Sequence, residues 1–288
     1  EGEGGGSGSD LNAAADGDED AGGGGDTPAP PPFTKAVNCR KVYVFAQKTV
    51  AALSSGNPET GLKLYLNIAN SADRCAMAAR ESGAAEWSEF SSVAYELMAQ
   101  AFLLYEDEVS DSKAQQRAIT SMVGTLLACR TFEREDFEAL VTKTAQYAAK
   151  LLKKADQCKM VTLCSHLFFN VDEDEQSTLR SHPQRVLECL QRALKIADAC
   201  SMASSANVQL FVDILDYYVY YFERNNPVIT DKFVSGLVAL INEHLGNMGL
   251  DSSAAVAEAR AHFQQIVRYI KQKKIDSDTA DRFAPIVC

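Results

Sequence analysis

Apolar side chains recur at helical spacing along almost the whole chain from residue 33 onward. In the segment 93–105, VAYELMAQAFLLY, one helical face carries Ala94, Leu97, Met98, Ala101, Phe102 and Tyr105. Helices are predicted to begin near Lys35, Pro58, Glu86, Asp111, Arg134, Ala155, Pro183, Ala206, Asp231 and Ser253. The aromatic-rich segment 208–222 would also fit a β-strand by composition. Its length and the spacing of its polar residues Gln209, Asp213 and Asp216 favour a helix.

Residues typical of helix ends support these boundaries. Asn57 before Pro58 is a capping residue followed by proline at the first helical position. Capping or early acidic residues also stand at Ser181, Thr230, Asp231, Asp251 and Ser253. Helix ends are predicted at Gly56, at Gly83, at Asn225-Asn226 before Pro227, and between Gly246 and Gly249.

The spacing of the predicted helices indicates a repeating architecture. The ten starts lie 21 to 28 residues apart, so two helices recur about every 48 residues. This period is close to the roughly 40–47 residues of HEAT-type helix pairs, although the sequence shows no self-similarity at that period. Short joints favour antiparallel neighbours. We therefore expect an all-α fold, a HEAT-like α-solenoid of about ten antiparallel helices, with a compact helical domain as the alternative.

The first 32 residues differ sharply from the rest. They hold ten of the seventeen glycines, half of the eight prolines and eight acids, but no Lys or Arg. Eight of the net −11 charges therefore lie there, and −3 remains for residues 33–288. Such a composition cannot bury enough apolar surface to fold. We predict a disordered Gly/Asp/Pro-rich segment at 1–32 and a C-terminal α-solenoid domain at 33–288. The chain begins at Glu1 and shows no signal peptide, so a fragment of a longer protein is expected.

Segment 208–222 reads VQLFVDILDYYVYYF and is apolar on nearly all sides. A helix of this kind must be covered by more than one neighbour, which favours a central position in the stack. The alternative is that its tyrosines line a protein interface, where aromatic residues are enriched. The candidate partner-facing aromatics are Tyr217, Tyr218, Tyr220 and Tyr221.

Two charged clusters stand at helix ends. Glu106, Asp107 and Glu108 follow the apolar segment 93–105, where the helix dipole favours cations instead. Lys150, Lys153 and Lys154 form a compact basic patch at another helix end. This patch could complement the acids, either within one chain or in another copy. Asp111 is well placed to cap the next helix, so a structural role in this joint is expected.

No arrangement of residues indicates catalysis. The four histidines and eight cysteines match no zinc spacing, and no phosphate-binding glycine loop precedes a Lys and Ser or Thr. We predict a non-enzymatic protein without metal or cofactor. Basic residues form no sustained face for nucleic acid, and no apolar run is long enough to span a membrane. Scattered cysteines suit a reducing, cytoplasmic compartment. Two alternatives remain: a phosphopeptide-binding helical module and a helical hydrolase with a Cys nucleophile.

Several segments together resemble a known family. They are 93–115 (VAYELMAQAFLLYEDEVSDSKAQ), 148–157 (AAKLLKKADQ), 163–168 (LCSHLF) and 186–200 (VLECLQRALKIADAC), with weaker likeness in 44–53 and 208–223. In this order they are similar to the C-terminal half of the large retromer subunit, the vacuolar protein sorting-associated protein 35 family. The likeness covers about residues 40–270.

The resemblance implies a non-catalytic α-solenoid scaffold of the endosomal coat that returns transmembrane cargo to the Golgi or the plasma membrane. It implies binding to the small retromer subunit, which has a metallophosphoesterase-like fold, and association with other coat subunits. It places the protein in the cytoplasm, peripheral on endosomal membranes. It also implies a weak homodimer, in which Glu106, Asp107, Glu108, Lys150, Lys153 and Lys154 would take part. Asp111 matches a position where substitution impairs retromer function.

The sequence also departs from the family pattern. Phe169 stands where the family usually has Trp, and the loop 172–181 is unfamiliar. The segment 276–288 matches loosely, and residues 1–32 show no likeness. No contact with the small subunit can therefore be assigned to an individual residue from the resemblance.

Overall fold

The structure is a computed structural model that describes residues 38–169, 181–201, 207–248 and 253–288. Its α-helices are α1 (Cys39–Ser54), α2 (Pro58–Glu81), α3 (Trp87–Glu108), α4 (Ser112–Ala128), α5 (Arg134–Lys150), α6 (Lys154–Cys164), α8 (Pro183–Ser201), α9 (Val208–Glu223), α10 (Asp231–Asn247), α11 (Ala254–Lys273) and α12 (Ala280–Phe283). A short 3-10 helix, η1 (Ser165–Phe168), follows α6. Within the described ranges there is no strand, so the all-α prediction is confirmed. The segment predicted to be disordered, 1–32, lies outside these ranges.

Most predicted boundaries agree with the structure. Four helices begin at the predicted residue, and most of the others begin one residue away. The predicted starts at Lys35 and Ala206 lie outside the described residues. The helix end predicted between Gly246 and Gly249 is confirmed, because α10 ends at Asn247 and the Met248 backbone N–H closes it by donating to the His244 carbonyl. Neither η1 nor α12 was predicted, because each is a single short turn without a periodic pattern.

Local chemistry explains where the helices begin and end. The Asn57 side chain accepts a hydrogen bond from Thr60 N at 3.1 Å, and Ser253 Oγ accepts one from Val256 N at 3.4 Å. Gly83 and Asn225 follow α2 and α9 with φ of +71° and +60°, respectively. Glycine and asparagine tolerate this left-handed conformation, so both positions end their helices as predicted.

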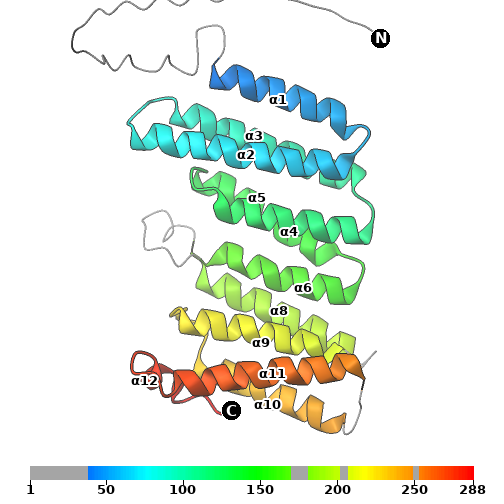
Figure 1. Cartoon of the computed structure of the whole chain (residues 1–288), viewed down its shortest axis with the longest axis vertical. Helices are drawn as coiled ribbons and strands as arrows, with labels where there is room; N and C mark the ends of the chain where they lie inside the picture. Colours follow the sequence, from blue (N-terminus) through cyan, green and yellow to red (C-terminus); the bar gives the residue numbers. More distant parts are fainter. Residues whose placement is uncertain (1–37, 170–180, 202–206, 249–252) are drawn as a thin grey trace, which may run out of the picture. The chain divides into compact units, whose positions relative to one another are not determined.

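Residues 39–288 form a stack of helix pairs in two layers (Figure 1). Helices α2, α4, α6, α9 and α11 follow one another in the first layer, and each contacts the next. Helices α3, α5, α8 and α10 lie in the second layer. Successive joints alternate between the two edges of the stack, which places the α3–α4 and α5–α6 joints on the same edge (Figure 1). This arrangement confirms the predicted α-solenoid.

Helix α9 occupies a central position, with contacts to α6, α8, α10 and α11. Tyr218 and Tyr221 are 1% and 0% exposed, which corrects the proposal that they face a partner. Tyr221 Oη lies 2.8 Å from Ser165 Oγ and 3.1 Å from His166 Nδ1, so its hydroxyl is satisfied within the core. The nearly continuous apolar pattern of this segment therefore reflects burial on several sides.

A buried carboxylate holds one joint to a neighbouring helix pair. Asp73 of α2 is 1% exposed and accepts hydrogen bonds in the α4–α5 joint. Its oxygens lie 2.9 Å from Arg130 N, 2.9 Å from Thr131 N and 2.6 Å from Thr131 Oγ1. A buried carboxylate is costly unless its lone pairs are occupied. Here three donors from one joint satisfy it, so α2 fixes the turn between α4 and α5.

Candidate protein-interaction surfaces

The predicted acids stand at the end of α3, and their environments differ. Asp107 and Glu108 are exposed and make no ion pair with another described residue. Glu106 Oε1 accepts a hydrogen bond from Tyr147 Oη at 2.6 Å and lies 3.1 Å from Lys143 Nζ. The Tyr147 hydrogen bond, assisted by Lys143, lowers the pKa of Glu106. Two of the three acids are therefore available at the surface, and the third is tied to α5.

The predicted lysines surround the α5–α6 joint. Lys150, Lys153 and Lys154 are all exposed, and Lys154 Nζ donates to Gln157 Oε1 at 3.1 Å. Between them stands Leu152, whose surface is 88% exposed, whereas the preceding Leu151 is 4% exposed. The joint thus presents an apolar side chain among cations.

The acidic and basic joints lie close together. They share one edge of the stack (Figure 1), and Tyr147 bridges their helices through its bond to Glu106. Lys150 also contributes electrostatically to the lowered pKa of Glu106, which indicates that charge of the basic joint reaches the acidic one. We call this surface the joint edge and define it by its exposed residues Asp107, Glu108, Lys150, Leu152, Lys153 and Lys154.

Asp111 has the capping contact expected from its position. It is the N-cap of α4, and its Oδ2 accepts a hydrogen bond from Ala114 N at 2.8 Å. The same joint is held by Gln115 Nε2, which donates to the Val109 carbonyl at 3.0 Å. A carboxylate at a helix N-terminus is also favoured by the helix dipole. Asp111 therefore shapes the joint from within, and its role in the family's function stays a prediction.

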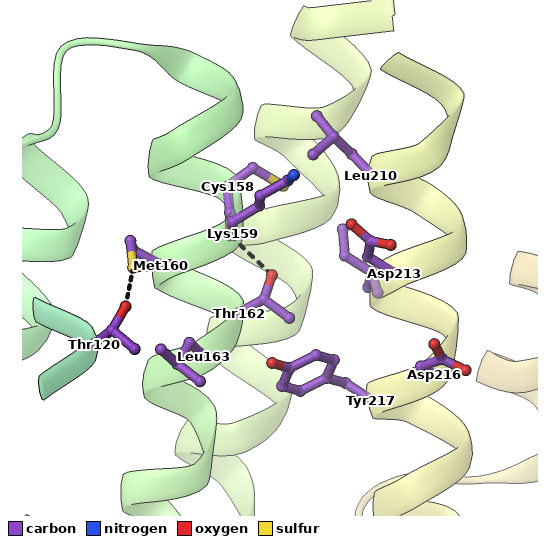
Figure 2. Close-up of a pocket in the computed structure, with 11 residues that line it drawn as sticks. Thr120, Cys158, Lys159, Met160, Thr162, Leu163, Leu210, Asp213, Asp216 and Tyr217 are labelled. Carbon is purple, nitrogen blue, oxygen red and sulfur yellow. Dashed lines mark hydrogen bonds between the residues drawn. The ribbon is translucent and has the colours of Figure 1, made fainter. Parts of the chain in front are cut away.

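The remaining candidate tyrosines lie on the face formed by α6, α9 and α11. Tyr217 and Tyr220 are half-buried, and each borders a cavity. One cavity, of about 320 Å³, lies between α6 and α9, where Tyr217 points toward Thr162 and Leu163 (Figure 2). The other, of about 510 Å³, lies between α9 and α11 and is bordered by Tyr220 and Tyr269. The aromatic side chains thus line hollows on one face.

A polar network contributes residues to the lining of both cavities. His262 Nε2 of α11 lies 2.7 Å from Asp216 Oδ2, and its Nδ1 lies 2.9 Å from Gln209 Nε2. Gln209 Nε2 also donates to Asp213 Oδ1 at 2.5 Å. Burial raises the pKa of Asp216, although the His262 ring opposes that shift. The network explains the three polar positions in the sequence of α9: they fasten it to α11.

The chemistry of the described residues does not support the two alternatives. A nucleophilic cysteine needs a lowered pKa, whereas burial raises the pKa of the thiols of Cys158, Cys189 and Cys200. A phosphopeptide site needs converging cations, whereas the cavities beside α9 place Asp213, Asp216 and Glu223 next to their cations. No group of three or more His, Cys, Asp or Glu suited to a metal was found among the described residues. No described helix is long and apolar enough to cross a membrane.

Sequence reasoning missed three residues of these surfaces. Lys143 and Tyr147 hold Glu106, and His262 links the acids of α9 to α11. A sequence signal existed for the first two, since Lys143, Tyr147 and Lys150 recur at i, i+4 and i+7 on one face of α5. His262 gave no such signal, because its partners lie about 50 residues earlier in the chain.

The two-layer stack of helix pairs, with a core shared between neighbours, defines a helical-repeat protein, a class that uses extended faces and edges to bind other proteins. A family model described as Vacuolar protein sorting-associated protein 35 matches residues 17–244. The chain belongs to this family, which confirms the resemblance. The match begins earlier and ends earlier than the range 40–270 inferred from the sequence, and it includes part of the segment 1–32.

Relatives with the family's name cover most of this chain. It is 39% identical over 239 residues to Vacuolar protein sorting-associated protein 35B of Arabidopsis thaliana, covering 81% of this chain and 28% of that protein. It is 37% identical over 221 residues to Vacuolar protein sorting-associated protein 35 of Schizosaccharomyces pombe, covering 76% and 25%. The chain therefore spans about a quarter of the length of these relatives. A solved structure titled DHF58 filament matches at 13% identity over 81% of this chain and 94% of that one. Its TM-score of 0.23 is too low to support an argument about fold or function.

Proposed function

We propose that this chain is a non-catalytic scaffold segment of a retromer coat, peripheral on the cytoplasmic side of endosomes. In this role it binds the small retromer subunit, takes its place among the other coat subunits, and supports retrograde transport of transmembrane cargo to the Golgi or the plasma membrane. The family match over residues 17–244 carries the proposal. The stack of helix pairs supports it, because such stacks offer large binding surfaces without a catalytic centre.

The α6–α9–α11 face is the surface proposed for the small subunit. It has two cavities, of about 320 and 510 Å³, and half-buried tyrosines border both of them. Tyrosine is enriched among the residues that dominate protein interfaces, because a large ring is buried at low entropic cost. The Asp216–His262 contact keeps the α9 and α11 sides of this face together.

A pull-down with the purified small subunit tests this docking surface. Replacing both Tyr217 and Tyr220 with Ala should weaken capture at least tenfold, since an interface aromatic of this kind contributes about 2 kcal/mol or more. Tyr95→Ala is the matched control, because Tyr95 is a half-buried tyrosine on α3 in the other layer. If the unaltered chain fails to capture the small subunit, the proposed scaffold function is wrong. If the double variant binds as well as the control, the partner occupies another face.

Self-association through the joint edge is the second part of the proposal. Both signs of charge are exposed side by side on this edge, so a second copy turned about a two-fold axis can match acid with lysine twice. Each exposed ion pair contributes only about 0–1 kcal/mol. The resulting homodimer should therefore be weak and sensitive to salt.

Charge reversal tests this pairing. Changing Lys150, Lys153 and Lys154 to Glu should abolish self-association at low salt, as should changing Asp107 and Glu108 to Lys. Mixing the two variants should restore a dimer, because each then presents the opposite charge. The readout is sedimentation equilibrium at two salt concentrations. Unchanged self-association of either single variant would contradict the charge-pairing mechanism without affecting the small-subunit proposal.

A further inference from the structure

Leu152 is the most exposed large apolar side chain in the described part of the chain, at 88%. Its position is fixed by its surroundings. Leu151 beside it is buried, Gln157 N donates to the Lys153 carbonyl at 2.8 Å, and the Gln157 side chain donates to the Ala149 carbonyl. The joint is therefore well anchored, and it holds Leu152 outward.

The charges around Leu152 restrict what can cover it. Lys150 and Lys153 flank it, are exposed and form no ion pair with another described residue. Asp107 and Glu108 on the neighbouring joint are also exposed and form no ion pair with another described residue. An anionic lipid surface would attract the lysines and repel the acids. A partner with one sign of charge would satisfy half of the surface. A second copy of this chain carries both signs in the same arrangement and can satisfy all of it.

We propose that Leu152 is the apolar centre of a two-fold contact between two copies of this chain. The inference rests on the proposed self-association and adds to it an apolar group that contributes affinity beside the ion pairs. In a two-fold contact each residue meets the same surface of the other copy, so both leucines leave water together. Exposed ion pairs give orientation and salt dependence, whereas burial of apolar area gives an attraction that salt does not screen.

The test uses sedimentation equilibrium of the whole 288-residue chain with Leu152→Ser. The dissociation constant of the dimer should rise about a hundredfold at low and at moderate salt. This is one factor of ten from each copy, or about 1.4 kcal/mol per leucine. Because Leu152 is exposed in the single chain, circular dichroism and the melting temperature should stay unchanged at concentrations where both proteins are monomeric.

Ile275→Ser is the matched control. Ile275 is 80% exposed and also follows lysines, at the end of α11. Those lysines are already engaged, since Lys273 Nζ lies 2.9 Å from Glu223 Oε1 and Lys274 donates to the Ile286 carbonyl. The control should leave the dissociation constant unchanged.

The outcomes separate this inference from the proposed charge pairing. If the lysine-to-glutamate variant loses the dimer and Leu152→Ser keeps it, the role of Leu152 is refuted and the charge pairing stands. If Leu152→Ser and Ile275→Ser weaken the dimer equally, the effect is general apolar association, and the role of Leu152 is again refuted. If the unaltered chain stays monomeric but loses binding to phosphatidylserine vesicles on Leu152→Ser, the occupant is a membrane and both statements about self-association fail.

Discussion

The buried carboxylate of Asp73 gives a quantitative prediction for stability. In Asp73→Asn the side-chain oxygen can still accept from Thr131 N, from Thr131 Oγ1 and, at 3.1 Å, from Arg130 N, but the new amide group replaces the oxygen that lies 2.9 Å from Arg130 N. One charge-assisted hydrogen bond is lost, at about 1.5–3 kcal/mol, and two donors then oppose each other in a buried site. We therefore expect the free energy of locally opening the α4–α5 joint to fall by about 2–4 kcal/mol.

Hydrogen exchange of single amides measures this loss locally, which suits a stack whose parts can open separately. The reporters are Cys129 N, which donates to Thr125 O, and Phe137 N, which donates to Glu133 O, on either side of the joint. Their exchange should accelerate about 30- to 700-fold, since 1.4 kcal/mol is a factor of ten. Asp198→Asn, an exposed change on α8, is the control. Acceleration below about threefold at both amides would refute the idea that Asp73 fixes this joint.

Two further predictions concern other parts of the stack. Gly61→Ala should lower the free energy of unfolding by about 1–3 kcal/mol, because the added Cβ would lie 2.1 Å from Ser54 Oγ and 3.1 Å from Ser54 Cα. Urea unfolding measures this, and Gly124→Ala, where an added Cβ meets nothing within 4 Å, should not destabilise the chain. Tyr147→Phe should raise the pKa of Glu106 toward its usual value, as NMR titration of the carboxyl carbon would show. Because the folded pKa of Glu106 is lowered, its stabilising contact is present above the unfolded pKa and is lost as pH falls through the folded pKa. An unchanged titration in the Phe variant would mean that Lys143 alone holds the carboxylate.

The sequence predicted helix existence well, because caps and periodicity are local. Asn57-Pro58 and Asp111 specify their helix starts through contacts within three residues, and the structure shows those contacts. Side-chain exposure was harder to predict for α9. Tyr217, Tyr218, Tyr220 and Tyr221 look alike in sequence, yet two are buried and two are half-buried, because neighbours from four other helices decide which side is covered.

The features that the sequence did not predict depend on contacts between residues distant in the chain. The sequence marks Asp73 only as one acid on a long helix, since its donors lie 57 and 58 residues further on. Glu106 was grouped with Asp107 and Glu108 by charge, whereas the structure separates it through Tyr147, 41 residues away. Spacing on one helix cannot reveal which neighbouring helix faces a polar group. Such pairs become visible once the order of stacking is known.

The two fastenings on either side of the α2–α5 region have a mechanical consequence. Asp73 pins the α4–α5 joint at one edge of the stack, and the bond between Tyr147 and Glu106 pins α3 to α5 at the other. Because contacts hold this region at both edges, its helices resist rotation relative to one another about the long axis of the stack. A force applied to the joint edge would then move α2–α5 as one unit, without rotating one helix pair against the next. An assembly built through that edge would inherit a fixed angle from the fold of each copy.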